Sequence, residues 1–499
     1  MTDIIKKISL SILGLYILTG IALLFWIVVY SGSTDGDTLE HVHSSWLVYN
    51  NKIPYKDFFQ HHNPLLWYVG APFVGMFPYS LKAIDAVNML TVCFAVIMFI
   101  YIYKIHKDFL SDKLGGLIAI SFCLYAHESL FIKDFKPDNY MTTCLVVGIY
   151  YLFCYVRDKK IKDLVVSFLL LFLSFMFTQK AVLILLCLGL IGIYLVYKKQ
   201  LSLPDVLISA SLPIMIYLAY LTYLWYHDIL TMYIKANFEL NSHIPAVFHT
   251  RRFIYPSWEM IFPLLLSFYA LFNYCYKGNV YIKTTCFIFI AEYVIRLYYF
   301  TPFVYYYSFL HVIASIMAGV TASEFSKKYK YFIWVILCYF VAVGTFYIHM
   351  YSKRIPINDS YKYGASGFVL MHTTPCDYVL NGYRIGYNLF NKDISFIWNL
   401  LGQIDVIAAT IGIKPLDDLE GLIRKYRPKI IHGKTYYDTY LEYRGAIQTY
   451  PIHPISQKLL SDMYTPLHRD DLYILKPEYQ SYDCKYNPRT KTYEYRDMN

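Results

Sequence analysis

The residues best suited to chemistry gather between positions 33 and 67. Carboxylates and imidazoles crowd this stretch among aromatic residues, and a loop that only meets water needs few of them. They are Asp35, Asp37, Glu40, His41, His43, Asp57, His61 and His62. Such side chains are the usual groups for proton transfer in catalysis. We therefore expect this stretch to form part of a catalytic or binding site.

Asp37, Glu40 and His41 are spaced to share one face of a helix, because residues three and four apart are neighbours on a helix surface. A carboxylate there can act as a general base, with a neighbouring His or Glu tuning its pKa. We expect Asp37 and Glu40 to be the catalytic carboxylates, with Asp37 as the base. The alternative is a capped helix start, with Asp37 as the N-cap residue and Glu40 three residues on.

The same stretch has some features of a metal site. The spacings His41-x-His43 and His61-His62 match no standard closed zinc site. Asp35 and Asp37 form an Asp-x-Asp motif like the one with which nucleotide-sugar enzymes hold a divalent ion, but a motif of three residues is weak evidence. We predict no cofactor, and a divalent metal is the alternative.

Other ionisable residues lie close to apolar stretches or inside them. Arg251 and Arg252 can clamp a phosphate or anchor the chain at a membrane interface. Glu292 and Arg296 are four residues apart within one apolar stretch. Ionisable groups in such places are costly and often functional, and a structural ion pair is the alternative.

The composition indicates what kind of protein positions these residues. The chain of 499 residues is 57% hydrophobic and 16% charged, with a mean hydropathy of +0.37, whereas soluble domains carry about 25% charged residues. This excludes an ordinary water-soluble enzyme and a disordered chain. Residues 351–499 hold 35 of the 80 Asp, Glu, Lys and Arg residues. We therefore predict a membrane domain over 1–350 and an extracytoplasmic domain over 351–499.

Eleven apolar stretches are candidates for membrane-spanning helices, each of which needs about 20 residues. They are 8–30, 82–103, 114–130, 139–156, 164–178, 181–197, 204–224, 257–276, 280–299, 304–322 and 331–350. The fifth and sixth are short and closely joined, so a broken or re-entrant pair is an alternative there. The first is too long for a secretory signal, and we expect it to be a retained anchor.

Lys and Arg residues concentrate in every second connection between these stretches. Positive residues remain on the cytoplasmic side of a membrane, so we predict a cytoplasmic N-terminus. The segments 31–81, 128–139, 225–256 and 299–304 are then outside, together with the tail after Met350.

The tail has an α/β pattern. The sequence predicts short strands at 376–380, 429–432 and 471–475. It also predicts a helix at 416–426, with Asp417 and Asp418 in its first turn and Pro428 beyond its end. The predicted fold class is an α-helical polytopic membrane protein with a C-terminal α/β domain. Cys376 and Cys484 lie outside the predicted spans and can form a disulfide or remain thiols.

The first outside segment resembles the bacterial branch of the polyprenyl-phosphate-sugar glycosyltransferases, in the GT-C group that includes glycosyltransferase family 39. The motifs are an acidic residue after the first span, then Glu-His-x-His at 40–43, then Pro-Tyr-x-Asp-Phe-Phe-x-His-His-x-Pro-Leu at 54–65. Protein O-mannosyltransferases, aminoarabinose transferases and lipopolysaccharide-core transferases belong to this group. The motifs cover about residues 30–185. The resemblance implies a GT-C fold and a sugar taken from a lipid phosphate on the outer face.

Within this resemblance, Asp37 matches the catalytic acidic position, although the usual Asp-Glu pair is Asp37-Thr38 here. His62 stands where some members carry a Lys for the lipid phosphate. Lys136 and Asp138 resemble an Arg-Pro-Asp element, with Lys136 in place of Arg. Thr178-Gln-Lys180 resembles a Ser/Thr-x-Lys turn at headgroup height. The alternatives are snorkelling for Lys180 and helix capping for Asp138.

We therefore predict a set of substrate-binding residues in addition to the two carboxylates. They are His41, His43, Asp57, His61, His62, Lys136, Asp138, Gln179, Lys180 and Arg296. The predicted function is inverting transfer of a sugar from a polyprenyl-phosphate donor to an acceptor hydroxyl on a glycan, lipid or protein outside the cytoplasm. The predicted location is the bacterial inner membrane, and no nucleic-acid partner is expected. A transporter or flippase of a lipid-linked glycan is the alternative, and a non-catalytic scaffold is a further one.

Overall fold

A computed structural model describes residues 2–30, 36–125, 132–247, 258–298, 307–329, 331–352, 364–381, 388–396, 411–413, 418–433, 455–467, 472–487 and 492–497. The chain forms two compact units. The first consists of Met1–Ser31, Asn88–Tyr223 and Phe248–Ile355, and the second consists of Gly32–Val87, Leu224–Val247 and Pro356–Asn499.

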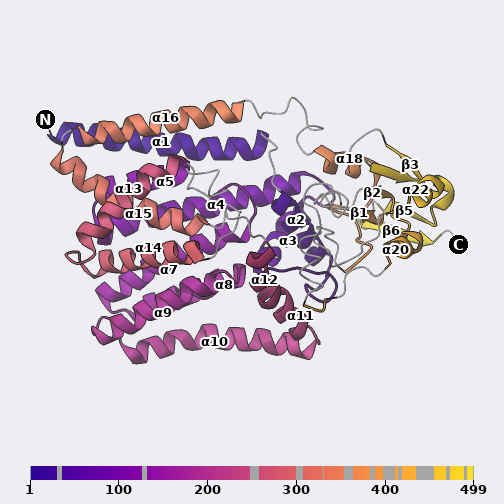
Figure 1. Ribbon diagram of the computed structural model, residues 1–499, viewed down its shortest axis with the longest axis horizontal. Coiled ribbons are helices and arrows are strands. Elements are labelled where there is room, and N and C mark those ends of the chain that lie inside the picture. Colours follow the sequence, from indigo (N-terminus) through magenta and orange to yellow (C-terminus); the bar gives the residue numbers. More distant parts are fainter. Residues whose placement is uncertain are drawn as a thin grey trace. The chain divides into compact units, whose positions relative to one another are not determined.

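The first unit is helical. Its elements are α1 (Thr2–Tyr30), α4 (Lys82–Ile105), the π-helix η1 (His106–Leu110), α5 (Lys113–Tyr125), α7 (Pro137–Asp158), α8 (Ile161–Phe177), α9 (Ala181–Tyr197), α10 (Leu203–Tyr226), α13 (Trp258–Tyr274), α14 (Val280–Tyr298), α15 (Ser308–Lys328) and α16 (Phe332–Ser352). Each of the eleven apolar stretches overlaps one of these helices. Within the unit, α7 packs along α8 and α1 runs alongside α16 (Figure 1).

Five helical segments of the described chain are long and apolar enough to cross a membrane: Lys7–Tyr30, Lys82–Leu110, Pro137–Asp158, Leu203–Tyr226 and Ser308–Lys328. Shorter apolar helices occupy several other predicted spans, such as Ala181–Tyr197 and Phe332–Phe346. The prediction of a mostly helical, multi-pass fold is therefore confirmed, and the number eleven stays a prediction.

Helix α15 is buried from Ser308 to Ser323, which is most of its length. Small residues allow this close packing. A Cβ atom placed on Gly319 would lie 2.5 Å from the carbonyl oxygen of Gly115 in α5. The α5 and α15 backbones therefore approach closely, and this crossing fixes the middle of the first unit.

The second unit mixes helices with two small sheets. Its elements are α2 (Gly36–Tyr49), α3 (Leu65–Met76), α11 (Leu230–Ile234), η2 (Lys235–Glu239), α12 (Leu240–Val247), α18 (Gly364–His372), β1 (Val379–Leu380), α20 (Leu419–Tyr426), β2 (Ile430–His432), α22 (Gln457–Met463), β3 (Tyr464–Pro466), β4 (Leu472–Leu475), η4 (Pro477–Tyr479), β5 (Tyr482–Asn487) and β6 (Thr492–Asp497). The first sheet has the order β1-β2-β4-β3, and β5 pairs with β6. Strands β1 and β2 are parallel, and the other neighbours are antiparallel.

The α/β pattern of the tail is confirmed in its main elements. Strands β1, β2 and β4 lie within the three stretches that were predicted to be strands. Helix α20 ends before Pro428, as predicted. Asp418 is its N-cap, and its side chain accepts a hydrogen bond of 2.7 Å from the Gly421 amide. Asp417 lies outside the described residues.

Cys376 and Cys484 form a disulfide with their Cα atoms 6.0 Å apart. The bond joins the chain just before β1 to strand β5, across a sequence separation of 108 residues. It therefore links the first sheet to the final hairpin. Of the two states that the sequence left open for these cysteines, the structure has the disulfide.

Replacing both cysteines, Cys376→Ser with Cys484→Ser, is expected to destabilise the second unit by about 2–5 kcal/mol, since the cross-link restricts the unfolded chain. The measurement is the thermal unfolding midpoint of purified protein, with and without reductant. Cys338→Ser is the matched control, because Cys338 carries a free thiol. A midpoint equal to that of the unmodified protein in both conditions would contradict the prediction.

Candidate active site

The predicted helix around Asp37 is confirmed as α2, and most of its side chains are polar yet buried. Glu40, His41, His43, Ser44 and Ser45 are all buried. The two serine hydroxyls donate to carbonyl oxygens one turn earlier in the helix, at 2.9 and 2.8 Å, so their hydrogens have acceptors within α2. The carboxylate and the imidazoles of α2 thus lie in a protein interior, where their interactions are stronger than in water.

Asp37 is half-buried and lies in the first turn of α2. The N-terminal end of a helix carries a partial positive charge, which stabilises a carboxylate at this position. This location favours the ionised form, which a general base requires. Asp35 lies outside the described residues.

Glu40 is held by a side chain from the loop before α3. Its Oε1 accepts a hydrogen bond of 3.0 Å from Nε2 of Gln60, and the same amide nitrogen donates to Oγ of Ser44 at 2.8 Å. Glu40 and Gln60 are 5% and 1% exposed. The Glu40 carboxylate is therefore positioned by a buried amide that the sequence analysis did not single out.

His41 is linked to Trp67 of α3. The indole Nε1 of Trp67 donates to Nδ1 of His41 at 3.2 Å. An indole nitrogen can only donate, so Nδ1 of His41 is an acceptor and the ring proton is on Nε2. The ring of His62 meets His41 edge-on at 5.4 Å, and the His61 and His62 rings are 4.1 Å apart. Three of the predicted site histidines therefore form one cluster.

The loop that carries His61 and His62 is fixed by residues far away in the sequence. Asn241 of α12 donates to the carbonyl oxygen of His61 at 2.8 Å, and Tyr233 of α11 donates to Oδ1 of Asn63 at 2.9 Å. The hydroxyl of Tyr55 also donates to the His62 carbonyl oxygen. Sequence reasoning missed the first two contacts, because nothing in a single sequence connects positions about 170 residues apart.

Two other predicted residues have contacts that shape the second unit. Asp57 is exposed, and its Oδ2 accepts a hydrogen bond of 2.7 Å from the Ile53 amide in its own turn. His43 is fully buried, and its Nε2 lies 2.9 Å from Oδ2 of Asp393.

In the first unit, Asp138 and Lys180 form an ion pair. Nζ of Lys180 lies 3.2 and 3.3 Å from the two carboxylate oxygens of Asp138. Asp138 lies in the first turn of α7, and Lys180 immediately precedes α9. The two elements taken from the resemblance, Lys136–Asp138 and Thr178–Lys180, are thus neighbours in space. Lys136 and Gln179 are both buried, at 1% and 5% exposure.

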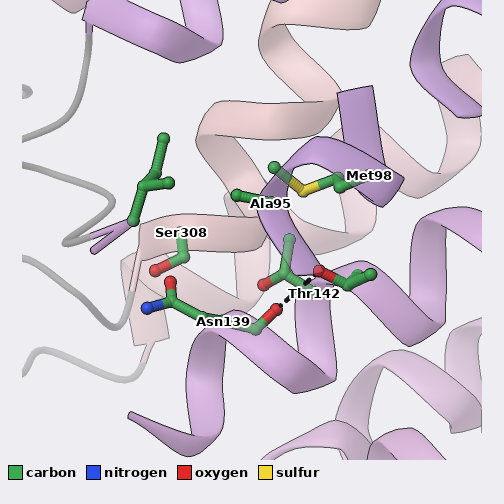
Figure 2. Close-up of a pocket in the computed structure, with 7 residues that line it drawn as sticks. Ala95, Met98, Asn139, Thr142 and Ser308 are labelled. Carbon is green, nitrogen blue, oxygen red and sulfur yellow. Dashed lines mark hydrogen bonds between the residues drawn. The ribbon is translucent and has the colours of Figure 1, made fainter. Parts of the chain in front are cut away.

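A small cavity lies at the end of α7 that carries Asp138. It is lined by Asn139, Thr142 and Thr143 of α7, Ser308 of α15, and apolar side chains of α4 and Ile132. Figure 2 shows the side chains of Asn139, Thr142 and Ser308 converging on this space. Oγ1 of Thr142 has no hydrogen-bond partner in the described part of the chain. The cavity therefore offers polar groups at this end of α7.

Arg296 is paired within its own helix. Its guanidinium makes two hydrogen bonds of 3.1 Å to the Glu292 carboxylate in α14. Glu292 is 1% exposed and Arg296 is 9% exposed. The ion pair that the sequence analysis gave as an alternative is present. Arg251 and Arg252 lie outside the described residues.

No group of three or more His, Cys, Asp and Glu side chains is arranged to hold a metal ion within the ranges that the structure covers. The cluster of His41, His61 and His62 has two buried rings, those of His41 and His62, and a half-buried one, that of His61. Its groups can donate and accept hydrogen bonds to a polar substrate.

Comparisons with known proteins show which family model and which folds the chain resembles. Residues 62–226 match the family model of dolichyl-phosphate-mannose-protein mannosyltransferases. No curated protein matches the chain. The fold is similar to that of ArnT from Cupriavidus metallidurans in the apo state, with a TM-score of 0.57 and 11% identity over 94% of this chain and 98% of that chain.

Two further solved structures share the fold. The undecaprenyl-phosphate-bound form of the same ArnT gives a TM-score of 0.54 at 10% identity, over 94% of this chain and 99% of that one. The apo oligosaccharyltransferase of Archaeoglobus fulgidus gives 0.53 at 11% identity, over 96% and 74%. At these identities the likeness shows the fold. Together with the family match, it confirms the resemblance found in the sequence.

Proposed function

We propose that this chain is a polyprenyl-phosphate-sugar dependent glycosyltransferase of the GT-C type, which its family match and fold support. We further propose that it transfers its sugar by one inverting displacement outside the cytoplasm. The observation that carries the proposal is the family match over residues 62–226. The match begins at His62, within the loop that packs against the buried polar helix α2.

The proposed chemistry begins at Asp37. Its carboxylate removes the proton from the acceptor hydroxyl while that oxygen attacks the anomeric carbon of the sugar. The bond between the anomeric carbon and the phosphate oxygen breaks, and polyprenyl phosphate leaves with the bonding electrons. No covalent intermediate forms, so the anomeric centre is inverted. Glu40, held by Gln60, supports Asp37 as the second carboxylate.

The leaving phosphate needs positive charge close to it. We assign this role to Lys180, Lys136 and His62, with Arg296 as a further cation. Lys180 and Arg296 each already have a carboxylate partner, so each offers a charge whose position is fixed before the donor binds. Asp138 and Gln179 then orient the Lys180 ammonium, and His41, His61 and Asp57 complete the proposed substrate-binding set. His43, predicted to belong to this set, is fully buried and supports α2 from within.

The donor class is proposed from the relatives. ArnT has been solved with undecaprenyl phosphate, and the Archaeoglobus fulgidus oligosaccharyltransferase with dolichol-phosphate and an inhibitory peptide. We propose a carrier of this kind for the present chain. The proposed acceptor is a hydroxyl on a glycan, lipid or protein of the cell envelope.

We also propose that the chain spans a bacterial inner membrane eleven times, with its N-terminus in the cytoplasm. Two observations support this orientation. The loop charges predict that three segments of the chain lie on the same side of the membrane. These segments, 32–87, 224–247 and 356–499, form one unit. That unit also contains a disulfide, which persists in oxidising compartments.

A topology reporter tests the orientation. A reporter that is active only outside the cytoplasm is expected to be active when fused after Met350 and inactive when fused after Lys199. The reason is that Lys198 and Lys199 belong to a positively charged loop, which is retained inside. The reverse pattern would place the proposed active groups on the cytoplasmic face and contradict the proposal.

The function itself is tested by product formation. Purified protein is incubated with lipid-linked sugars extracted from bacterial membranes, and free polyprenyl phosphate is measured by mass spectrometry. A transferase releases this product when an acceptor is present. A transporter or flippase moves the intact lipid-linked sugar and releases none, so an absence of release with active membrane extracts as the positive control would favour that alternative.

A further inference from the structure

Residues 388–396 of the tail lie against α2, the helix that carries Asp37 and Glu40. The contact is centred on His43, which is fully buried three residues after Glu40. Nδ1 of His43 lies 3.2 Å from the carbonyl oxygen of Leu389, and Nε2 lies 2.9 Å from Oδ2 of Asp393. One imidazole of α2 therefore contacts this segment through both of its nitrogens.

The chemistry of these partners determines where the hydrogens are. A carbonyl oxygen only accepts, so Nδ1 of His43 donates to Leu389. Nε2 lies 2.9 Å from Oδ2 of Asp393, so these two side chains share a hydrogen bond. The Asn388 amide lies farther from Nε2, at 3.2 Å, and donates to the other oxygen of Asp393. His43 and Asp393 thus form a hydrogen-bonded pair whose carboxyl group is oriented by Asn388.

The same segment contacts two other parts of the N-terminal region of the second unit. The Phe59 amide donates to the carbonyl oxygen of Phe396 at 2.8 Å, next to the loop of His61 and His62. The ring of Phe390, which is fully buried, lies 6.5 Å from Trp46 of α2 and 6.2 Å from Tyr79. The contact between residues 388–396 and α2 is therefore extended and well packed, and the His43–Asp393 pair is one part of it.

The segment is in turn fixed to the first sheet of the tail. The Val379 amide in β1 donates to the carbonyl oxygen of Lys392 at 3.0 Å, and the Lys392 amide donates to Asp377 at 2.9 Å. Cys376, next to Asp377, carries the disulfide to β5. A continuous path of backbone hydrogen bonds and one covalent bond thus leads from the C-terminal hairpin to α2.

We propose that the C-terminal domain is a positioning element of the transferase, and that the hydrogen-bonded His43–Asp393 pair sets the orientation of α2 and thereby of the Asp37 and Glu40 carboxylates. His43 and Asp393 act through α2 and are positioning residues. This inference rests on the proposed function for its catalytic part only. The orientation of α2 can be measured without any substrate.

The physical reason is that α2 is short, with 14 residues, and a helix of this length is marginal unless tertiary contacts hold it. Its position therefore depends on its neighbours. A displacement of about 1 Å in a catalytic group can cost about 100-fold in rate. Loss of the His43–Asp393 contact is expected to lower kcat and to leave the donor KM unchanged. The reason is that Lys136 and Lys180, which are proposed to bind the donor phosphate, are not on α2.

The experiment compares Asp393→Ala, His43→Ala and the double variant in the full-length protein. Asp418→Ala is the matched control, because it removes the N-cap of α20 and destabilises the same domain through a different helix. The first readout is hydrogen exchange of the α2 amides without substrate. The second is kcat and KM for release of polyprenyl phosphate from extracted lipid-linked sugars.

The expected result is faster exchange in α2 and a kcat lower by about 10- to 100-fold in both single variants, with no further loss in the double variant. Asp393→Asn keeps the shape and one acceptor, so it should recover part of kcat. Asp418→Ala should leave kcat and the exchange of α2 unchanged. Unchanged α2 exchange in Asp393→Ala would overturn the inference, as would a loss of kcat in Asp418→Ala as large as in Asp393→Ala. If the unmodified protein releases no polyprenyl phosphate, the proposed function fails, while faster α2 exchange still establishes the positioning contact.

Discussion

Asp37→Asn is expected to abolish sugar transfer, with a loss of at least about 10²- to 10⁴-fold, which is the usual contribution of a general base. The amide has nearly the shape of the carboxylate but cannot accept the acceptor's proton. Folding and donor binding should change little, because Asp37 is half-buried at the first turn of α2. The measurement is release of polyprenyl phosphate, together with the thermal unfolding midpoint.

Asp418→Asn is the control for this experiment. It makes the same chemical change in the second unit, at the N-cap of α20, where the carboxylate accepts from the Gly421 amide and Asn caps a helix as well as Asp does. Its effect should therefore be much smaller than that of Asp37→Asn. Turnover close to that of the unmodified protein in Asp37→Asn would remove Asp37 from the mechanism. If Glu40→Gln alone were inactive, the base would be reassigned to Glu40.

The second large effect is expected at Lys180. A direct substitution there is ambiguous, because it also leaves the Asp138 carboxylate, with 4% of its side chain exposed, without its ammonium partner. Breaking a buried ion pair from one side is strongly destabilising. We therefore compare Asp138→Asn alone with Asp138→Asn combined with Lys180→Met. In this pair of variants, no buried carboxylate loses its counter-ion when the lysine is replaced.

Adding Lys180→Met to Asp138→Asn is expected to raise the donor KM by roughly ten- to hundred-fold, the value of a hydrogen bond to a charged group. The unfolding midpoint should change little between the two variants. Lys198→Met is the control, since Lys198 follows the opposite end of the same helix α9. An unchanged KM would mean that Lys180 only neutralises Asp138 and does not bind the phosphate.

The membrane helices and part of the tail could be predicted from the sequence because the signals are local. Long apolar runs locate α1, α4, α7, α10 and α15 directly. Strands β1 and β2 are short apolar segments with turn residues nearby, and Pro428 predicts the end of α20. Each of these features depends on neighbouring residues, which a single sequence displays.

Three short helices of the second unit, α3, α11 and α12, were not predicted, because their sequences are ambiguous without tertiary contacts. Helix α3 is apolar but only 12 residues long, which reads as a loop next to a membrane span. Helices α11 and α12 are short and are stabilised by contacts such as those of Tyr233 and Asn241 with the loop at 61–63. Strand β3 and the β5–β6 hairpin were missed for the same reason.

The candidate residues were found, but their partners were not. Spacing alone identified Asp37, Glu40 and His41 as neighbours on a helix. The hydrogen bond from Gln60 to Glu40 and the contact of His43 with Asp393 connect segments that are 20 and 350 residues apart. Such pairs carry no local pattern, and only the folded chain brings them together.

The composition of the second unit also constrains how the protein matures in the cell. Residues 36–49 form α2 and leave the ribosome early, whereas their partners at 388–396 are synthesised about 300 residues later. At a synthesis rate of about 5–20 residues per second, α2 waits for roughly 15–60 s. During this time the buried imidazoles of His41 and His43 and the buried Glu40 carboxylate have no finished interior to occupy. Any nascent or prematurely terminated chain is therefore expected to be inert. Chaperones or quality-control proteases have this interval in which to recognise it.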